Sequence, residues 1–385
     1  MKIKSLRTWR IALPLRRPHT WAGNFTPVGY GYTVLKLELE DGTVGWGEAQ
    51  VLKDWGGEFG SRYGEAPQTT KIVIEELLAP LLVGEDCRQI ELLLAKMDKF
   101  VRGYPYAKAA IDVALHDAVG KLYGIPVYQL LGGMYRREVA LAHSLGLMDI
   151  QVAVDEAKHV VDEGITTLKV KVGIDAKRDI ELVRRLRAAV GPDVKLRVDA
   201  NQGYKSWKEA LQVTRVMQGE NIWYMEQPCE GLENMARVAQ NTDVPVMADE
   251  SAWTAHDVLR IIQFQAAEML SVYYTKPGGL LKSKKLLAVA EAAGLRCDIN
   301  GSGEMGIGNA ANLHLAASSA VIDLPGTIPV TSTAQIVRTK VAGHKYLDDI
   351  IEEPFIYRDG CMLVPEGPGL GITVNEAKLD QYSVG

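Results

Sequence analysis

Val194-Lys-Leu-Arg-Val-Asp199 is an apolar run with the alternation of a β-strand, and it ends in a carboxylate. Two later runs end in the same way, namely Ile222-Trp-Tyr-Met-Glu226 and Val244-Pro-Val-Met-Ala-Asp249. Neighbouring acids are separated by 27 and then 23 residues, about one strand-and-helix repeat each time. Because the carboxyl ends of parallel strands meet at one rim of a closed barrel, we expect the three acids to converge there.

Three converging carboxylates repel one another unless a cation lies between them. Ligands that are all oxygen atoms favour Mg²⁺ or Mn²⁺ over zinc or copper. An acid at the end of a strand is alternatively the N-cap of the next helix, which explains any one of the three as well as metal binding does. N-capping does not explain three acids at the same repeat. The sequence therefore predicts a metal site formed by Asp199, Glu226 and Asp249.

One repeat upstream, strand alternation in Thr167-Leu-Lys-Val-Lys-Val-Gly173 places Lys169 and Lys171 on one face. The apolar residues between them indicate a buried strand, so both ammonium groups are expected to point into the barrel mouth. A lysine beside another ammonium group and a divalent cation should have a lowered pKa, which makes a neutral amine available as a base.

Further motifs occur along the chain in a fixed order. They are Lys169-Val-Lys171, Val198-Asp-Ala-Asn201, Met225-Glu-Gln-Pro228, Ala248-Asp-Glu-Ser251, Lys276-Pro-Gly-Gly279 and Gly303-Glu-Met-Gly-Ile-Gly308. The ordered set resembles the enolase superfamily, in the group of mandelate racemase and muconate lactonizing enzymes. The metal-ligand pattern resembles the muconate lactonizing subgroup most. The resemblance spans essentially the whole chain, from Asp41-Gly-Thr-Val-Gly-Trp-Gly-Glu48 to Gly367-Pro-Gly-Leu-Gly371.

This resemblance implies an α/β fold, a modified TIM (β/α) barrel with an α+β capping domain. It also implies a Mg²⁺-dependent enzyme, with Mn²⁺ as the alternative metal, that abstracts the proton α to a substrate carboxylate via an enolate. Lys171 would be the base and Lys169 would assist the carboxylate oxygen. Asn201 and Glu250 would be pocket residues or partners of the ligands. The family's habit implies a homo-oligomer, either a dimer or an octamer.

Composition agrees with a metabolic enzyme of this kind. The chain has 385 residues, 47% hydrophobic and 24% charged, which is enough for one barrel and one smaller domain. A net charge of −5 gives no reason to expect nucleic acid or an anionic membrane as a partner. The amino-terminal segment lacks the apolar core of a signal peptide, and no apolar stretch reaches membrane-spanning length. The cysteines have no paired spacing, so we expect reduced thiols in the cytoplasm; they are Cys87, Cys229, Cys297 and Cys361.

The predicted order of elements divides the chain into three parts. Residues 1–125 form the capping domain, with an antiparallel meander over 3–13, 30–40 and 43–49 and helices over 67–82, 88–100 and 107–122. Residues 126–356 form the barrel, beginning after the breaker Gly124-Ile-Pro126. Residues 357–385 return to the cap. Barrel strands are expected over 139–144, 167–172, 194–199, 222–226, 244–249, 269–274, 295–300 and 321–324.

The sixth predicted barrel strand departs from the family pattern. Lactonizing and racemizing relatives carry a second lysine five residues before the Gly-Gly pair, and this position is Tyr273. Mandelate-type relatives carry an aspartate there and a histidine on the next strand, and the histidine position is Asn300. Lys276 matches a lysine that many relatives carry in addition, so we interpret it as structural. Tyr273 is either an acid, with its pKa lowered by a nearby cation, or a core aromatic residue.

Several other residues are candidates for the substrate pocket. His143 ends the first predicted barrel strand and is either a proton-transfer residue or a hydrogen-bonded wall residue. Glu304 lies after the seventh strand and is interpreted as a substrate or proton-relay residue. Two cap segments rich in glycine and aromatic residues, 19–26 and 54–64, have the composition of lids. Their candidate contacts are Trp21, Trp55 and Tyr63 for apolar or cationic groups and Arg62 for a second carboxylate.

These observations favour a cycloisomerase or a dehydratase acting on a small carboxylate, because a single base suffices for either reaction. A racemase or epimerase of an amino-acid or hydroxyproline-type derivative is the alternative, and Lys276 would then be the second base. Two alternatives lie outside the family. One is a Schiff-base aldolase, which would leave the three carboxylates without a purpose. The other is a non-catalytic barrel scaffold.

Overall fold

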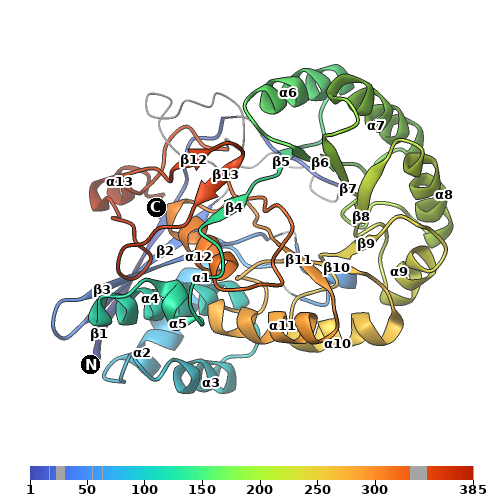
Figure 1. The fold of residues 1–385 in the computed structure, drawn as a ribbon. Helices are drawn as coiled ribbons and strands as arrows, with labels where there is room; N and C mark the ends of the chain where they lie inside the picture. Colours follow the sequence, from blue (N-terminus) through green and yellow to red (C-terminus); the bar gives the residue numbers. More distant parts are fainter. Residues whose placement is uncertain (17, 23–30, 54, 63, 330–344, 385) are drawn as a thin grey trace.

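The computed structural model describes residues 1–384 except 17, 23–30, 54, 63 and 330–344. Seven parallel strands form its central sheet, in the spatial order in which they occur along the chain. They are β5 (His143–Leu145), β6 (Thr167–Lys171), β7 (Lys195–Asp199), β8 (Ile222–Glu226), β9 (Val246–Ala248), β10 (Met269–Val272) and β11 (Arg296–Ile299). The sheet curls inside an arc of helices, which confirms the predicted barrel (Figure 1).

The expected eighth strand, 321–324, forms isolated bridges in place of a regular strand. Ile322 bridges Cys297 at one edge of the sheet, and Gly326 bridges Leu141 beside the other edge. The backbone N–H of Ala142 donates to the Gly326 carbonyl at 2.8 Å. Residue 325 is proline, which has no N–H to donate to a ladder and therefore opposes regular pairing. This short segment joins the two edges of the sheet.

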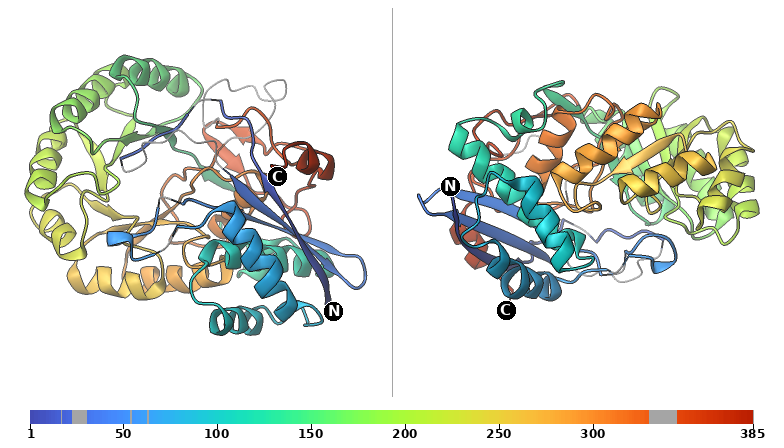
Figure 2. Two further views of the ribbon diagram at one scale, coloured as in Figure 1. Left: turned by 180° about the vertical axis from the view of Figure 1, so that it is seen from behind. Right: turned by 90° about the horizontal axis from the view of Figure 1, so that it is seen from below.

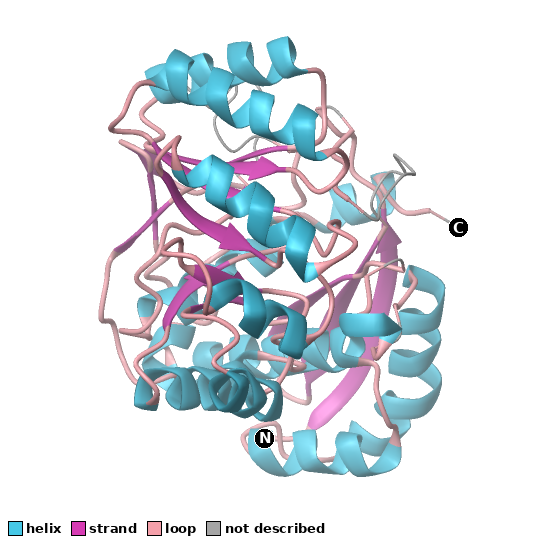
Figure 3. Ribbon diagram, turned by 90° about the vertical axis from the view of Figure 1, so that its right-hand side faces the viewer, coloured by secondary structure: helices cyan, strands magenta, loops and turns pink. Residues whose placement is uncertain are grey.

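Helices cover the outside of the barrel (Figure 3). They are α6 (Ile150–Asp162), α7 (Ala176–Val190), α8 (Trp207–Gln218), α9 (Leu232–Ala239), α10 (Ala255–Phe264), α11 (Leu280–Ala292) and α12 (Gly306–Ala317). Ser206 caps α8 and Thr254 caps α10 through side-chain oxygens, whereas Gly231 precedes α9 without a side-chain cap. The helices that follow β7, β8 and β9 are thus not capped by Asp199, Glu226 or Asp249, and the N-cap interpretation of these acids is wrong.

The capping domain begins with an antiparallel sheet, as predicted. Its strands are β1 (Ile3–Ile11), β2 (Tyr32–Leu39) and β3 (Val44–Gln50). The expected helix over 67–82 is divided into α1 (Pro67–Ile72), a π-helical turn (Val73–Leu78) and α2 (Ala79–Leu82). The remaining helices are the 3₁₀ turn Glu58–Gly60, α3 (Ile90–Phe100), α4 (Pro105–Tyr123) and α5 (Val127–Leu130).

The carboxy-terminal residues contact both parts of the molecule. Strands β12 (Tyr357–Arg358) and β13 (Cys361–Leu363) pair antiparallel with β4 (Glu138–Ala140). Helix α13 (Glu376–Gln381) lies against β1, where Trp9 Nε1 donates to Asp380 at 3.1 Å. Both termini lie on the side of the capping domain (Figure 2). The exact division at residues 125 and 356 stays a prediction. Among the described helices, none combines the length and the apolar character needed to span a bilayer.

Helix α4 packs directly on β3 because the strand carries glycine where the helix crosses it. A Cβ added at Gly45 would collide with the Ala114 carbonyl, and one added at Gly47 would collide with the Ala110 carbonyl. The alanine-rich stripe of α4 is therefore matched by a strand without side chains at these two positions. This close contact holds the helix and the sheet of the capping domain together.

Substitution Gly47→Ala should lower the free energy of unfolding by about 1–3 kcal/mol, because α4 and β3 would have to separate. Gly219→Ala is the matched control. Gly219 is exposed, has an ordinary helical φ of −62° and meets only Val216. This control should change the unfolding free energy by less than about 0.5 kcal/mol. Chemical denaturation of both variants measures the difference, and equal effects would contradict the packing account.

Candidate active site

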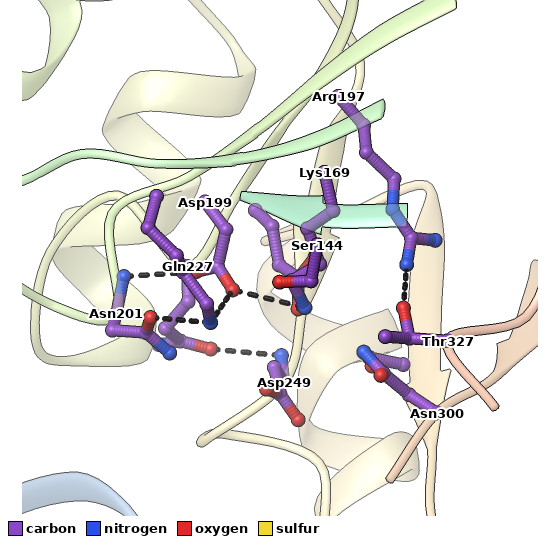
Figure 4. A network of polar contacts seen from close by, with 12 residues as sticks. Ser144, Lys169, Arg197, Asp199, Asn201, Gln227, Asp249, Asn300 and Thr327 are labelled. Atoms are coloured by element: carbon purple, nitrogen blue, oxygen red, sulfur yellow. Dashed lines mark hydrogen bonds and ion pairs between the residues drawn. The ribbon is translucent and has the colours of Figure 1, made fainter. Parts of the chain in front are cut away.

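Three carboxylates meet at the carboxyl ends of the barrel strands. Asp199 and Glu226 are the last residues of β7 and β8, and Asp249 follows β9 directly. One oxygen of each carboxylate lies within 4.8 Å of the others, and all three side chains are buried. Figure 4 shows Asp199 joined to Lys169 and Asn201, and Asp249 joined to Gln227. The convergence expected from the strand spacing is therefore present.

The backbone turns sharply where these strands end. Asn201 and Gln202 have φ of 43° and 65°, and Gln227 has φ of 36°. Such left-handed conformations cost energy in non-glycine residues and persist where surrounding contacts impose them. Gln227 Oε1 accepts the backbone N–H of Asp249 at 2.9 Å and that of Ser251 at 3.2 Å. Gln227 thus fixes the segment that carries Asp249. This role was not predicted from the sequence, although Gln227 directly follows Glu226.

Lys169 and Lys171 point into this cluster from β6. Lys169 Nζ lies 2.7 Å from Glu226 Oε1 and 2.9 Å from Asp199 Oδ2. Lys171 Nζ donates to Asp199 Oδ2 at 2.6 Å and to Asn201 Oδ1 at 2.7 Å. Asn201 is in turn fixed by Glu250, whose Oε1 accepts from Asn201 Nδ2 at 2.9 Å. The expected common face of the two lysines is confirmed.

The lowering of lysine pKa expected beside a divalent cation stays a prediction, and the protein's own groups act on Lys169 in the opposite direction. Burial alone would lower its pKa, but the charges of Asp199 and Glu226 outweigh burial and raise it above its ordinary value. The same contacts act on the acids. Burial opposes ionisation of Asp199, yet Lys169 and Lys171 hold its pKa below the usual range. Burial and the neighbouring Asp199 raise the pKa of Glu226 to about 8.

Lys276 is saturated with hydrogen bonds away from the substrate space. Its Nζ donates to Asp249 Oδ1 at 2.7 Å, to the Asp249 carbonyl at 2.9 Å and to the Ser271 carbonyl at 2.7 Å. These contacts use all three N–H groups of the ammonium. The ammonium also lies 4.5 Å from the ring centre of Tyr273 and 5.6 Å from that of Trp55. Lys276 therefore supports Asp249 and the aromatic wall.

Tyr273 lies where lactonizing and racemizing relatives were expected to carry a second lysine. Its hydroxyl lies 3.3 Å from Asp249 Oδ2, and its ring centre lies 5.2 Å from that of Trp55. Burial, followed by the nearby carboxylates, raises the pKa of Tyr273 well above its ordinary value. The lowering of this pKa expected from a nearby cation stays a prediction.

A cavity of about 90 Å³ opens above the carboxylates. Both proposed lid segments reach it, through Trp21 and Trp55. Of the sequence-predicted residues, those that line it are Trp21, Trp55, His143, Lys169, Lys171, Asn201, Asp249, Tyr273 and Asn300. Among the lining residues that were missed are two with hydroxyl groups and one distant lysine, none of which belongs to a motif. They are Ser144, Thr327 and Lys345.

His143 belongs to the cavity wall, but its ring faces the surrounding helix. His143 is paired in register with Leu168, while its neighbour Ser144 is paired with Lys169 and shares that inward face. His143 Nε2 lies 2.7 Å from Glu156 Oε1 on α6. The alternative that His143 is a hydrogen-bonded wall residue therefore describes the structure. Ser144 is the inward residue of β5 and lies beside Lys169 (Figure 4).

Arg62 and Glu304 do not line the cavity. Arg62 donates to both oxygens of Asp257, at 3.1 and 2.8 Å, so its expected bidentate carboxylate partner is a residue of α10. Tyr63 lies outside the described residues. Glu304 is buried behind Gly301 and does not line the cavity, and burial raises its pKa to about 7.

The donor set fits a hard divalent cation. All three candidate ligands are carboxylates, and within the described part of the chain no donor reaches the buried Glu226 Oε2. Such a cluster of buried oxygen atoms suits Mg²⁺ or Mn²⁺.

Sequence comparison identifies both parts of the chain. The family described as mandelate racemase/muconate lactonizing enzyme, N-terminal domain, matches residues 7–132. The family described as enolase C-terminal domain-like matches residues 152–378. The N-succinyl-L-Arg/Lys racemase of Bacillus cereus is 33% identical over 387 residues, covering 100% of this chain and 98% of that protein. Muconate cycloisomerase 1 of Rhodococcus opacus is 32% identical over 386 residues, covering 97% of this chain and 96% of that protein.

Solved structures agree with this assignment. The crystal structure of the Bacillus cereus racemase superposes with a TM-score of 0.90 at 31% identity, covering 100% of this chain and 99% of that one. A dipeptide epimerase from Enterococcus faecalis, complexed with Mg and the dipeptide L-Leu-L-Tyr, has a TM-score of 0.85 at 29% identity. The match covers 97% of this chain and 100% of that one. The chain therefore belongs to the mandelate racemase/muconate lactonizing enzyme family, within the enzymes of the enolase superfamily.

Proposed function

We propose that this protein is a Mg²⁺-dependent enzyme that removes the proton α to the carboxylate of a small substrate and completes the reaction with a single base. Asp199, Glu226 and Asp249 would hold the metal, with Mn²⁺ as the alternative ion. The all-oxygen donor set supports this choice, as does a related epimerase whose structure contains Mg. When bound, the cation chelates the substrate carboxylate and stabilises the negative charge that develops on it.

Lys171 is the proposed base because of its hydrogen-bond count. A neutral amine has two N–H groups and one lone pair. At Lys171, the two N–H groups would be used by Asp199 and Asn201, and the lone pair would face the cavity that the residue lines. Lys169, between Asp199 and Glu226, keeps its positive charge and places it beside the substrate carboxylate.

The single observation that carries the one-base proposal is the difference between Lys171 and Lys276. Lys276 makes three hydrogen bonds to protein oxygens and does not line the cavity, so it has no lone pair for a substrate proton. Tyr273 occupies the corresponding wall with a phenol. A 1,1-proton transfer needs a proton carrier on each face, and within the described residues the wall formed by Tyr273 and Lys276 offers no amine with a lone pair toward the cavity.

One base suffices for elimination or cycloisomerization. In an elimination, Lys171 takes the α-proton, the C–H electron pair becomes the new C=C bond, and the β-oxygen bond breaks. Lys171 then returns the proton to the departing hydroxyl group, which leaves as water on the same face. A cycloisomerization runs in the reverse direction: a carboxylate of the substrate adds to the β-carbon of a C=C bond, the electron pair of that bond passes to the enolate, and protonated Lys171 donates its proton to the α-carbon. We therefore favour a cycloisomerase or dehydratase.

The second candidate function is racemization or epimerization of an amino-acid derivative. The similarity to a racemase and to a dipeptide epimerase favours it. It requires Lys276 to leave its three oxygen partners, or Tyr273 to exchange protons in place of the missing lysine. We further propose a cytoplasmic homo-oligomer, a dimer or an octamer, supported by the family resemblance and by cysteines without paired spacing.

Adding Mg²⁺ to metal-depleted protein should raise the melting temperature by a few degrees, because a ligand that binds only the folded state stabilises it by roughly 2.7 kcal/mol at one hundred times its Kd. Asp249→Asn should abolish most of this shift. Asp243→Asn, an exposed site outside the cluster, is the control and should retain it. Differential scanning calorimetry measures both variants. A full Mg²⁺ shift in Asp249→Asn would contradict the proposed ligand set.

Deuterium exchange at the α-carbon in ²H₂O, screened by NMR over a library of carboxylic acids, tests the base. Lys171→Ala should reduce exchange by roughly 10²–10⁴-fold, the usual contribution of a positioned base. Lys158→Ala, at an exposed position on α6, should not reduce exchange. An absence of exchange with every acid, together with intact Mg²⁺ binding, would favour a binding or scaffold role.

The same screen separates one base from two. For an active chiral acid, the wild-type enzyme should exchange one epimer only, and Tyr273→Phe should leave that exchange within a few-fold. Lys276→Met should impair Mg²⁺ stabilisation together with exchange, because it supports Asp249. If Lys276→Met instead abolished exchange from one epimer while the other epimer and the Mg²⁺ shift stayed intact, the protein would be a two-base epimerase.

A further inference from the structure

One part of the capping domain, Trp55–Arg62, rests on the barrel and is here called the lid segment. Figure 2 shows this part of the chain, in blue, extending from the cap toward the barrel. The backbone N–H of Phe59 donates to Glu230 Oε1 at 2.6 Å. Arg62 donates to both carboxylate oxygens of Asp257, at 3.1 and 2.8 Å. The lid segment is therefore anchored on the segments that follow β8 and β9, the strands that lead to two of the candidate metal ligands.

A third anchor is Ser251, which lies two residues after the candidate ligand Asp249. Ser251 Oγ donates to the Glu58 carboxylate of the lid segment and accepts from Gln227 Nε2 at 2.7 Å. Gln227 Oε1 in turn accepts the backbone N–H groups of Asp249 and Ser251 (Figure 4). Met235 Sδ also lies 3.3 Å from Ser251 Oγ, but a carboxylate is the stronger acceptor. A continuous chain of hydrogen bonds therefore joins the lid segment to a candidate metal ligand.

The lid segment has the features of a part that opens at low energetic cost. Gly57, Phe59 and Gly60 have φ of 75°, 50° and 61°, and such a conformation costs energy in Phe59. The Phe59 side chain is 73% exposed. Trp253 Nε1 is buried beside Gly57 and has no acceptor among the described residues. Strain, an exposed aromatic ring and an unpaired buried donor all reduce the stability of the closed position.

The charges around Glu58 make its contact with Ser251 important for the closed position. Burial and the neighbouring Glu230 and Glu233 oppose a charged Glu58, whereas the Ser251 hydroxyl and Arg260 favour it. A hydrogen bond to a carboxylate is stronger than one between neutral groups. The position of the Ser251 hydroxyl therefore helps to decide whether the lid segment stays on the barrel.

We propose that Ser251 is a positioning residue that couples metal binding at Asp249 to closure of the lid segment, so that each favours the other. This inference rests on the proposed function, since the cation is taken to bind between the three acids. A cation that holds the Asp249 side chain also restricts the backbone up to Ser251, because both N–H groups share Gln227 as acceptor. The Ser251 hydroxyl then meets Glu58 at a smaller cost in entropy. Coupling between two sites is reciprocal, so closure strengthens metal binding by the same factor.

Hydrogen–deuterium exchange of the full-length protein, followed by mass spectrometry with and without saturating Mg²⁺, tests the coupling first. Mg²⁺ should slow exchange in peptides covering Trp55–Arg62 at least about fivefold, the lower end of usual coupling between sites. Peptides from α3, which lines no part of the cavity, should change less than about twofold. Equal exchange of the lid segment with and without Mg²⁺ would overturn the proposal.

Variants of Glu58 separate a hydrogen-bonded coupling from a simple effect of charge. Glu58→Met removes the acceptor for Ser251, so Mg²⁺ binding, measured by calorimetry, should weaken at least about fivefold, and Mg²⁺ should no longer protect the lid segment. Glu58→Gln loses the same charge but keeps a carbonyl oxygen as acceptor, and it should retain both properties. Glu76→Met is the matched control, because Glu76 is an exposed acid on the π-helical turn of the cap.

Two results with these variants would contradict the role of Ser251. Equal weakening of Mg²⁺ binding by Glu58→Met and Glu58→Gln would show an effect of charge alone. Unchanged Mg²⁺ binding in a folded Glu58→Met protein would show that no coupling exists. Thermal unfolding verifies the folding of each variant. Ser251→Ala provides a second uncoupled variant and should lose the protection of the lid segment by Mg²⁺.

Asp249→Asn distinguishes failure of the coupling from failure of the proposed function. Full Mg²⁺ binding by this variant would show that the cation binds elsewhere, which contradicts the proposed ligand set and the coupling together. If Mg²⁺ binds the wild-type protein and not Asp249→Asn, while exchange of the lid segment ignores Mg²⁺ in both, only the role of Ser251 fails.

Discussion

Three buried carboxylates within 4.8 Å of one another are the constraint on which the rest of this structure depends. Such a cluster is unfavourable in a low-dielectric interior unless positive charge compensates it. The protein supplies Lys169 and Lys171 from the neighbouring strand and Lys276 from beyond the sixth strand. Left-handed residues after two of the strands and the amide of Gln227 then fix the direction of each acid.

The number of acceptors around each lysine determines what that lysine can do. Lys171 has two protein acceptors and lines the cavity, which leaves a position for a substrate proton once the amine is neutral. Lys276 has three acceptors and does not line the cavity. It therefore holds the Asp249 side chain in place and packs against the rings of Trp55 and Tyr273. A chemical difference between the two faces of the substrate thus follows from hydrogen-bond geometry.

Strand periodicity was sufficient to predict most of the barrel, because each inward carboxylate or lysine follows a short apolar run that forms a strand. It failed at 321–324, where Pro325 prevents a regular ladder, and within 67–82, where a π-helical turn interrupts the helix. The failure within 67–82 lies in the capping domain, whereas the irregular segment after 321–324 leads directly to Thr327, which lines the cavity.

The site was predicted less completely than the fold. Local alternation was enough to place Lys169 and Lys171 together, but it said little about pKa, which depends on contacts between residues far apart in the chain. Burial and Asp249 raise the pKa of Tyr273, and Asp199 and Glu226 raise that of Lys169. Ser144 and Lys345 carried no motif, and Arg62 was expected at the substrate but binds Asp257.

Anomalous diffraction from a crystal of the full-length protein soaked in Mn²⁺ tests the central claim most directly. The account predicts one strong peak within ligand distance of carboxylate oxygens from Asp199, Glu226 and Asp249, with Lys171 beside it and facing the cavity. A peak at any other position, or the absence of a peak between these three residues at saturating Mn²⁺, would contradict the account.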